Sequence, residues 1–258
     1  MIKLFKIIIF PSLFLVVVVN PSSSQTFNSN LQNSKLQNGS RNKILIKAML
    51  TAGITAGLYS YDQKIKNWVQ KHRSKSSDRI SEFFRFFGDG KKLKFPLFIF
   101  YSYGYFFKNK KVKKTTILCL ESFLVSGTIT TVIKYAGHRH RPNTNDPYDR
   151  WDGPGFSNLN LSFPSGHSST AFSIATVIAS EYDNIFLIQL LSYGTATLTA
   201  LSRVNDNAHW ASDVFFGSAI GYFTAKAIIS LNRSKNEKKV FLPVINNRYS
   251  GLLILYTF

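Results

Sequence analysis

The chain has 258 residues, which is enough for one large domain, and nothing in it repeats with the period of a solenoid or a propeller. A net charge of +19 is compatible with a nucleic acid, an anionic membrane surface or a phosphorylated substrate as the partner. Because 15% of the residues are aromatic, including 23 Phe, the composition favours a membrane or a lipid ligand, and we expect no nucleic-acid partner. The single cysteine, Cys119, lies in an apolar segment, which excludes a disulfide framework and a cysteine metal site and predicts a core position.

The N-terminal 25 residues have the pattern of an export signal. Lys3 and Lys6 precede an apolar run at residues 7–19, and small residues follow it. An uncleaved N-terminal anchor helix is the alternative, although this run is short for a membrane span. Residues 26–42 are rich in Asn, Ser and Gln with few apolar side chains, so they are predicted to be an unordered polar linker.

A helical domain is predicted from residue 43 to residue 231, because long apolar segments alternate there with basic ones. The predicted helical segments are residues 43–61, 93–107, 115–136, 168–180, 185–200 and 211–231. Residues 232–258 are predicted to be a basic tail that contains a β-hairpin, with strands at 240–245 and 251–258.

Two basic segments separate the first three of these helices. Residues 62–94 carry ten Lys or Arg against four acidic residues and several Phe, which predicts a basic amphipathic helix at an interface. Residues 108–114, KNKKVKK, are predicted to form a cytoplasmic loop, because basic residues accumulate on that side of a membrane.

The stretch SRVNDNAHWASD, residues 202–213, has the spacing of an oriented nucleophile. His209 and Asp213 are four residues apart, so on a helix the carboxylate can accept a hydrogen bond from one imidazole nitrogen. The other nitrogen is then unprotonated and free to attack. Arg203 lies six residues before His209, and its permanently charged guanidinium suits the oxygens of a phosphate.

Two further stretches supply groups that bind anions. In KYAGHRHRP, Lys134 and Arg141 are two cations, and Pro142 holds the second one rigidly. In FPSGH, residues 163–167, a proline precedes a predicted helix start, where backbone N–H groups and the Ser165 hydroxyl can cradle an anion. Gly166 permits close backbone approach, and His167 stands beside the anion.

Together these groups meet the requirements of phosphoryl transfer without a metal ion. Three cations would stabilise the charge on the phosphoryl oxygens, His209 would attack in line, and His167 would protonate the leaving oxygen. A phosphohistidine would form on His209, and water would hydrolyse it with His167 acting as the base. We expect no cofactor.

Other polar residues in these stretches have simpler interpretations. Three residues between the cations of the first stretch are predicted to form a polar rim of the site: His138, Arg139 and His140. Asp206 and Asn207 resemble part of a metal site, but two neighbouring polar side chains without further ligands are more typical of a turn.

The three sequence blocks K-x6-R-P, P-S-G-H and S-R-x5-H-x3-D occur complete and in order. On these motifs, residues 43–231 resemble the type 2 phosphatidic acid phosphatase and vanadium haloperoxidase superfamily. The resemblance implies an all-α, six-helix-type bundle whose motifs meet on one face, and no metal requirement. It also implies the roles of eight residues: Lys134, Arg141 and Arg203 bind phosphate, Ser165 and Gly166 donate to it, His167 is the general acid, His209 the nucleophile and Asp213 its orienter.

This resemblance predicts a metal-independent phosphatase that hydrolyses a phosphomonoester or pyrophosphate, with a phosphorylated lipid as the expected substrate. The superfamily includes six-helix membrane enzymes and soluble secreted acid phosphatases. Apolar segments with interleaved basic loops favour the membrane class, whereas the mean hydropathy of −0.03 is low for it. We expect a bacterial envelope protein, embedded in or associated with the membrane, with its active site towards the periplasm.

Three alternatives remain open at this point. A soluble periplasmic acid phosphatase and a vanadate-dependent haloperoxidase would use the same residues, although the compact chain offers no extra domain for the latter. A non-catalytic envelope protein that binds anionic lipids would not require His209 backed by Asp213. The sequence does not indicate an oligomeric state.

Overall fold

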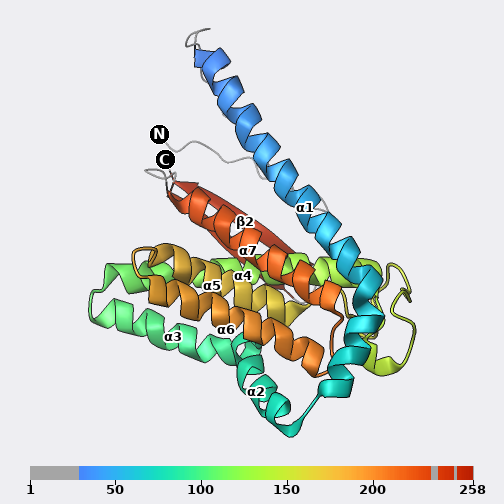
Figure 1. Cartoon of the computed structure of the whole chain (residues 1–258). Helices are drawn as coiled ribbons and strands as arrows, with labels where there is room; N and C mark the ends of the chain where they lie inside the picture. The colour runs from blue at the N-terminus through green and yellow to red at the C-terminus, as the bar shows by residue number, and fades with distance from the viewer. Residues whose placement is uncertain (1–28, 234–237, 247–248, 258) are drawn as a thin grey trace. The chain divides into compact units, whose positions relative to one another are not determined.

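The computed structural model describes residues 29–233, 238–246 and 249–257 (Figure 1). The chain divides into two compact units, of which the larger, Lys47–Arg233, is called the helical unit below. Residues 1–46 and 234–258 make up the other unit. The predicted export signal or anchor at residues 1–25 lies outside the described residues.

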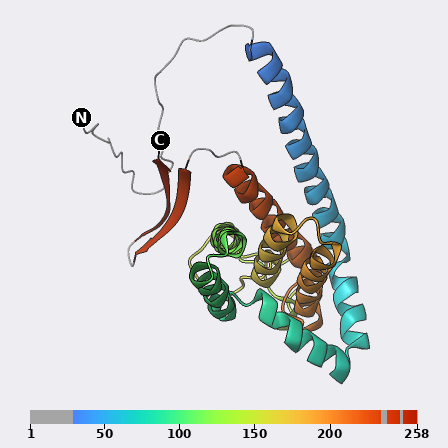
Figure 2. The same cartoon turned by 90° about the vertical axis from the view of Figure 1, so that its left-hand side faces the viewer.

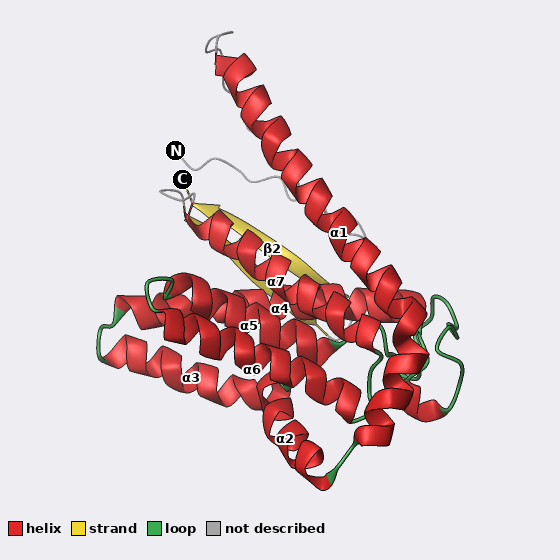
Figure 3. Cartoon of the chain, in the orientation of Figure 1, coloured by secondary structure: helices red, strands yellow, loops and turns green. Residues whose placement is uncertain are grey.

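The described residues form seven α-helices, two short 3-10 helices and one β-hairpin (Figures 1 and 3). The α-helices are α1 (Ser29–His72), α2 (Lys75–Arg85), α3 (Gly90–Phe106), α4 (Lys110–Gly137), α5 (Gly166–Glu181), α6 (Phe186–Asn205) and α7 (Ala211–Arg233). The 3-10 helices are η1 (Phe86–Gly88) and η2 (Pro142–Thr144). The predicted all-α body is therefore confirmed.

Short polar side chains set the starts of four helices. Ser74, Asp89, Asn109 and Ser165 are the N-cap residues of α2, α3, α4 and α5, and each side chain accepts a hydrogen bond from a backbone N–H of the first turn. These bonds satisfy donors that the helix itself leaves unpaired. The start of α5 is thus fixed by the same Ser165 that the sequence placed in the anion cradle.

Three predictions about the N-terminal half are wrong. The predicted linker is helical from Ser29 onward, because no proline interrupts residues 26–42 and an existing helix extends more easily than a new one nucleates. Residues 62–94 form the end of α1, all of α2 and the start of α3 rather than one amphipathic helix. Most of the lysine run lies in the first turns of α4, after a turn at Phe107 and Lys108.

Helix α5 lies at the centre of the helical unit, between α4 on one side and α6 on the other, and it also packs along α7 (Figure 2). Two glycines of α7 permit a close approach to α5. A methyl group at Gly217 would collide with the Ser165 carbonyl oxygen, and one at Gly221 would collide with the Ser169 carbonyl oxygen. This contact brings the start of α7 against the start of α5, where the site lies.

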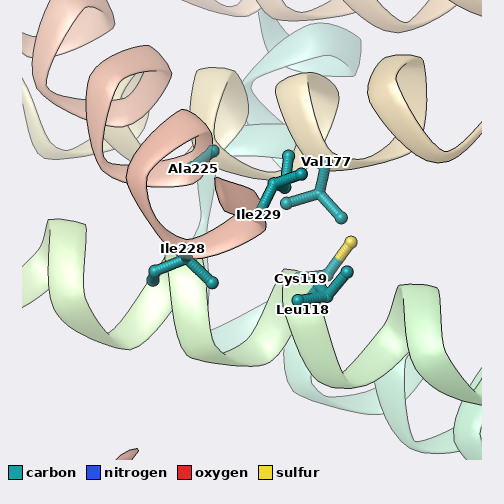
Figure 4. Packing of buried hydrophobic residues seen from close by; sticks show 6 residues of the cluster. All are labelled: Leu118, Cys119, Val177, Ala225, Ile228 and Ile229. Atoms are coloured by element: carbon teal, nitrogen blue, oxygen red, sulfur yellow. The ribbon is translucent and has the colours of Figure 1, made fainter. Parts of the chain in front are cut away.

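A buried apolar cluster joins α4, α5 and α7 (Figure 4). Its members are Leu118, Cys119, Val177, Ala225, Ile228 and Ile229. The predicted core position of Cys119 is therefore confirmed, since only 2% of the residue is exposed. This cluster holds the three helices whose ends carry most of the site residues.

The predicted C-terminal hairpin is present. Strand β1 (Lys238–Asn246) pairs antiparallel with β2 (Tyr249–Thr257) in a two-stranded sheet (Figure 3). The pairing runs from Lys238 opposite Thr257 to Asn246 opposite Tyr249.

By length and composition, two of the described helices could cross a membrane, α4 with a hydropathy of 1.7 and α7 with 1.5. Helix α3 is shorter but presents large aromatic side chains outward, for example Phe95 and Phe98, which are 70% and 68% exposed. Such a continuous apolar surface is typical of a membrane or protein contact.

Candidate active site

The predicted site residues come together where four helix ends meet: the end of α4, the start of α5, the end of α6 and the start of α7. Ser165 N at the start of α5 donates to Asp213 O on α7 at 2.9 Å. At the end of α6, His209 N donates to Arg203 O at 3.2 Å. Backbone hydrogen bonds therefore tie the second and third motifs together.

The first motif joins them through Lys134, at the end of α4. Its Nζ donates to Leu161 O and, at 3.3 Å, to Ser162 O, just before α5. A methyl group at Gly166 would lie 4.0 Å from Lys134 Cε, so the lysine side chain passes beside the start of α5. Two predicted phosphate-binding residues, Lys134 and Gly166, are thus neighbours.

His209 lies just before α7 rather than on it, because the helix starts at Ala211. Its Nδ1 is 3.6 Å from Asp213 Oδ2, which is too long for a hydrogen bond, so the carboxylate lies beside this nitrogen without being bonded to it. Burial lowers the pKa of His209 to about 3, although the neighbouring Asp213 opposes this shift. The imidazole is therefore neutral at physiological pH, as a nucleophile must be.

Asp213 is fully buried, and several donors other than His209 fix its carboxylate. Oδ1 accepts from Arg139 Nη1 at 2.6 Å. Oδ2 accepts from Ser162 Oγ at 2.6 Å and from Trp210 N at 3.0 Å. The carboxylate that faces His209 therefore has a defined orientation.

Arg203 and Arg141 offer donors that the described protein groups do not use. Arg203 Nη1 donates to Asp206 Oδ2 at 2.7 Å, whereas its buried Nε has no hydrogen-bond partner among the described residues. The half-buried guanidinium of Arg141 forms no hydrogen bond or ion pair within the described part of the chain. A buried donor without a partner is costly, so Arg203 Nε favours a bound anion.

The start of α5 supplies neutral donors. Ser165 Oγ accepts from Ser168 N at 3.4 Å and from Ser168 Oγ at 2.9 Å, so its own hydrogen is left to donate elsewhere. The N–H groups of Gly166 and His167 belong to the first turn, whose donors the helix leaves unpaired. These groups lie where the anion cradle is predicted.

His167 projects from this first turn beside the cations. Burial, followed by the positive charge of Arg203, lowers the pKa of His167 to about 4. Gly88 of η1 packs directly against it, since a methyl group there would lie 2.8 Å from His167 Cβ. Gly88 could not be predicted as part of the site, because no local pattern marks a close approach between distant segments of the chain.

The predicted polar rim is wrong: His138, Arg139 and His140 are 3%, 0% and 7% exposed. His138 contacts Gly153 O and Ser157 O through its two ring nitrogens, both at 2.9 Å. These residues turn inward because the loop after α4 folds back over them, so their polar groups meet partners inside the protein.

His140 is clamped by two carboxylates of the same loop. Its Nδ1 lies 2.7 Å from Asp146 Oδ2, and its Nε2 lies 2.9 Å from Asp152 Oδ1. Burial alone would lower the pKa of His140, but the hydrogen bonds to Asp146 and Asp152 outweigh burial and raise it. The His140 imidazole therefore joins two parts of the loop that follows Pro142 through its contacts with Asp146 and Asp152.

Asp206 does more than form a turn. Besides Arg203, it contacts Arg85 of α2 at 3.6 Å and accepts from Ser81 Oγ at 2.7 Å. Asn207 takes a positive φ of 55°, as expected for a turn residue. Within the described residues, no group of three or more His, Cys, Asp or Glu side chains is arranged to hold a metal ion.

A helical bundle with a buried carboxylate beside His209, and with cations at its helix ends, has the features of the class that the sequence motifs predicted. Residues 115–237 match the sequence model of the PAP2 superfamily, so the predicted resemblance is confirmed. The structure is similar to a transmembrane PAP2-type phosphatidylglycerolphosphate phosphatase from Bacillus subtilis. The TM-score is 0.57 at 22% identity, covering 74% of this chain and 94% of that one. This likeness confirms the fold.

Two relatives align in sequence. The lipid A 1-phosphatase of Porphyromonas gingivalis is 32% identical over 120 residues, which are 46% of this chain and 24% of that protein. A PA-phosphatase related-family protein of Dictyostelium discoideum is 28% identical over 183 residues, 61% of this chain and 65% of that protein. The chain therefore spans less than two thirds of the length of either relative.

Proposed function

We propose that the protein is a metal-independent phosphatase that cleaves phosphate from a lipid through a phosphohistidine on His209. One observation supports this most strongly: a buried, neutral His209 faces Asp213, in a site where the buried Nε of Arg203 has no hydrogen-bond partner among the described residues. Mere anion binding would not require a neutral imidazole backed by a carboxylate. The names of both relatives, a lipid A 1-phosphatase and a PA-phosphatase related protein, support the same class.

The reaction follows from the positions of the two histidines. Because Nδ1 of His209 faces Asp213, Nε2 attacks phosphorus, and the bond between phosphorus and the lipid oxygen breaks. His167 gives its proton to that oxygen. Water then attacks the phosphohistidine, His167 takes a proton from the water, and the bond from phosphorus to nitrogen breaks to release phosphate.

The electrostatics of His167 suit this role once substrate is bound. The positive charge of Arg203 disfavours a protonated His167 in the protein alone. A phosphoryl dianion bound among Lys134, Arg141 and Arg203 would offset that charge and favour the protonated imidazole. Substrate binding would thereby prepare the general acid.

The apolar surface supports a lipid substrate and a membrane location. Helices α4 and α7 are long and apolar enough to span a bilayer, and the outward aromatic side chains of α3 provide a further apolar face. Residues 1–25 have the pattern of an export signal or anchor, which supports a bacterial envelope location with the site towards the periplasm.

Phosphate release from a panel of lipid phosphates, measured with a chelator present, tests this function. The wild type should release phosphate, and H209A should reduce the rate by about 1,000-fold or more, as for removal of a nucleophile. H72A is the matched control, since His72 is an exposed histidine at the end of α1. A trapped, acid-labile phosphoenzyme that is absent from H209A would identify the intermediate, whereas full release by H209A would contradict the proposal.

A further inference from the structure

Arg139 stands between Lys134 and Arg141 in the sequence, yet its side chain is completely buried. The backbone fixes its direction: Arg139 forms an isolated β-bridge with Trp151, and its carbonyl accepts from Ser162 N at 3.0 Å. The guanidinium therefore points into the protein, behind the site rather than into it.

All five N–H donors of the Arg139 guanidinium have partners. Nε and Nη2 donate to Tyr148 O at 3.1 and 2.8 Å, and Nη2 also donates to Asp62 Oδ2 at 2.8 Å. Nη1 donates to Ser212 Oγ at 2.8 Å and to Asp213 Oδ1 at 2.6 Å. Since a guanidinium has five N–H groups, none remains for a substrate anion.

Asp62 of α1 completes this network from the opposite side. Its Oδ1 accepts from Ser212 N at 2.9 Å, and its Oδ2 accepts from Ser212 Oγ as well as from Arg139. Because Ser212 precedes Asp213 directly, the ring formed by Asp62, Arg139 and Ser212 also fixes the backbone of the orienting carboxylate.

Aromatic rings enclose the charges. The guanidinium carbon of Arg139 lies 4.7 Å from the ring centre of Tyr59 and 5.4 Å from those of Trp151 and Trp210. Polar networks shielded from water in this way are strong when complete, and a buried charge left unpaired is costly. Arg139 forms ion pairs with carboxylates on two different helices, Asp62 on α1 and Asp213 on α7.

The two oxygens of Asp213 are thereby made distinct. Arg139 holds Oδ1, which leaves Oδ2 facing His209 Nδ1 with support from Ser162 and Trp210. We propose that Arg139, held in turn by Asp62, is a positioning residue that fixes the Asp213 carboxylate against the nucleophile. This inference rests on the proposed phosphohistidine function.

The test uses the full-length protein, a lipid phosphate that the wild type hydrolyses, and a charge-balanced variant. R139M alone leaves two carboxylates unpaired, so R139M with D62N is the main variant, and D62N alone is its reference. The turnover number, KM, inhibition by inorganic phosphate and the melting temperature are measured for each. R79M is the matched control, since Arg79 is an exposed arginine on α2.

We expect the double variant to lose about 10- to 100-fold in kcat, as is usual for residues that orient a catalytic group. KM and inhibition by inorganic phosphate should stay within about threefold, because Arg139 has no donor left for the anion. R139K keeps the charge but not the five-donor geometry, so it should lose kcat as well while remaining folded. R79M should behave as the wild type.

A double-mutant cycle separates positioning from general structural damage. In a D213N background, R139M with D62N should lower kcat no further, because the group it positions is already altered. Full kcat in the double variant, or an equal loss with and without Asp213, would overturn the inference. If the double variant does not fold, the kcat of R139K is the deciding measurement. A wild-type kcat in R139K would overturn the inference. A wild type without turnover would overturn the proposed function and this inference together.

Discussion

Gly217 offers a sharp test of how helix packing sets the site. G217A would place a methyl group against the Ser165 carbonyl oxygen and 3.1 Å from Ser165 N. The backbone of Ser165 cannot give way freely, because its N–H is bonded to Asp213 O at 2.9 Å. The start of α5 and the start of α7 must therefore move apart.

The expected magnitude follows from two opposing effects. Overpacking against rigid backbone costs about 1–3 kcal/mol, whereas replacing Gly by Ala inside a helix gains about 1 kcal/mol. G217A should thus destabilise the protein by roughly 0–2 kcal/mol, or lower Tm by up to about 8 °C for a unit of this size. G194A is the matched control on α6, because nothing lies within 4 Å of a methyl group at Gly194. It should raise Tm by about 2–4 °C.

Activity provides the second measurement. Ser165, Gly166 and His167 all lie at the start of α5, so a shift there should lower kcat/KM by about 10- to 100-fold. G194A should keep wild-type activity. Thermal melting and lipid-phosphate hydrolysis of the two variants check this, and a G217A protein that is as active and as stable as G194A would refute the packing argument.

Three further predictions concern charge. D206N removes the carboxylate that pairs with Arg203 and should raise KM by roughly tenfold in steady-state assays. H72A should leave KM unchanged. An unchanged KM in D206N would show that Arg203 does not need Asp206 to bind the substrate. Because burial lowers the pKa of His209 to about 3, the nucleophile stays neutral down to about pH 4. A loss of kcat/KM on acidification that is centred near pH 6.5 and caused by protonation of His209 would contradict this. The raised pKa of His140 stabilises its loop fully below the unfolded value of about 6.5, and that stability is lost as pH rises through the folded pKa. After correction for the intrinsic exchange rate, which itself rises with pH, residues 143–162 should therefore be less protected from hydrogen exchange at pH 9 than at pH 6, and H140N should show no such change in protection.

Local pattern predicted much of this molecule. Apolar segments longer than a dozen residues, each ended by polar or turn-forming residues, gave helices close to α3 through α7. The hairpin followed from two apolar runs around Asn247 and Arg248. The predicted helix boundaries were wrong where the local sequence does not decide the end of a helix. Residues 29–42 are too polar to predict a helix, yet they continue α1 because extension from an existing helix costs little.

The site shows the same division between local and tertiary information. Spacing alone brought His209 near Asp213, and the helix predicted from residue 168 starts two residues earlier, at Gly166, after its cap Ser165. The prediction that Arg139 lies on a polar rim was wrong because charged residues near a site are usually solvated. Its partner Asp62 is 77 positions away in the sequence and contacts it only in the folded protein. A charge can be buried when every donor is satisfied, and that condition depends on partners from several helices. Residues that bind a substrate can thus be found from motif spacing, whereas residues that hold those groups in place emerge only with the fold.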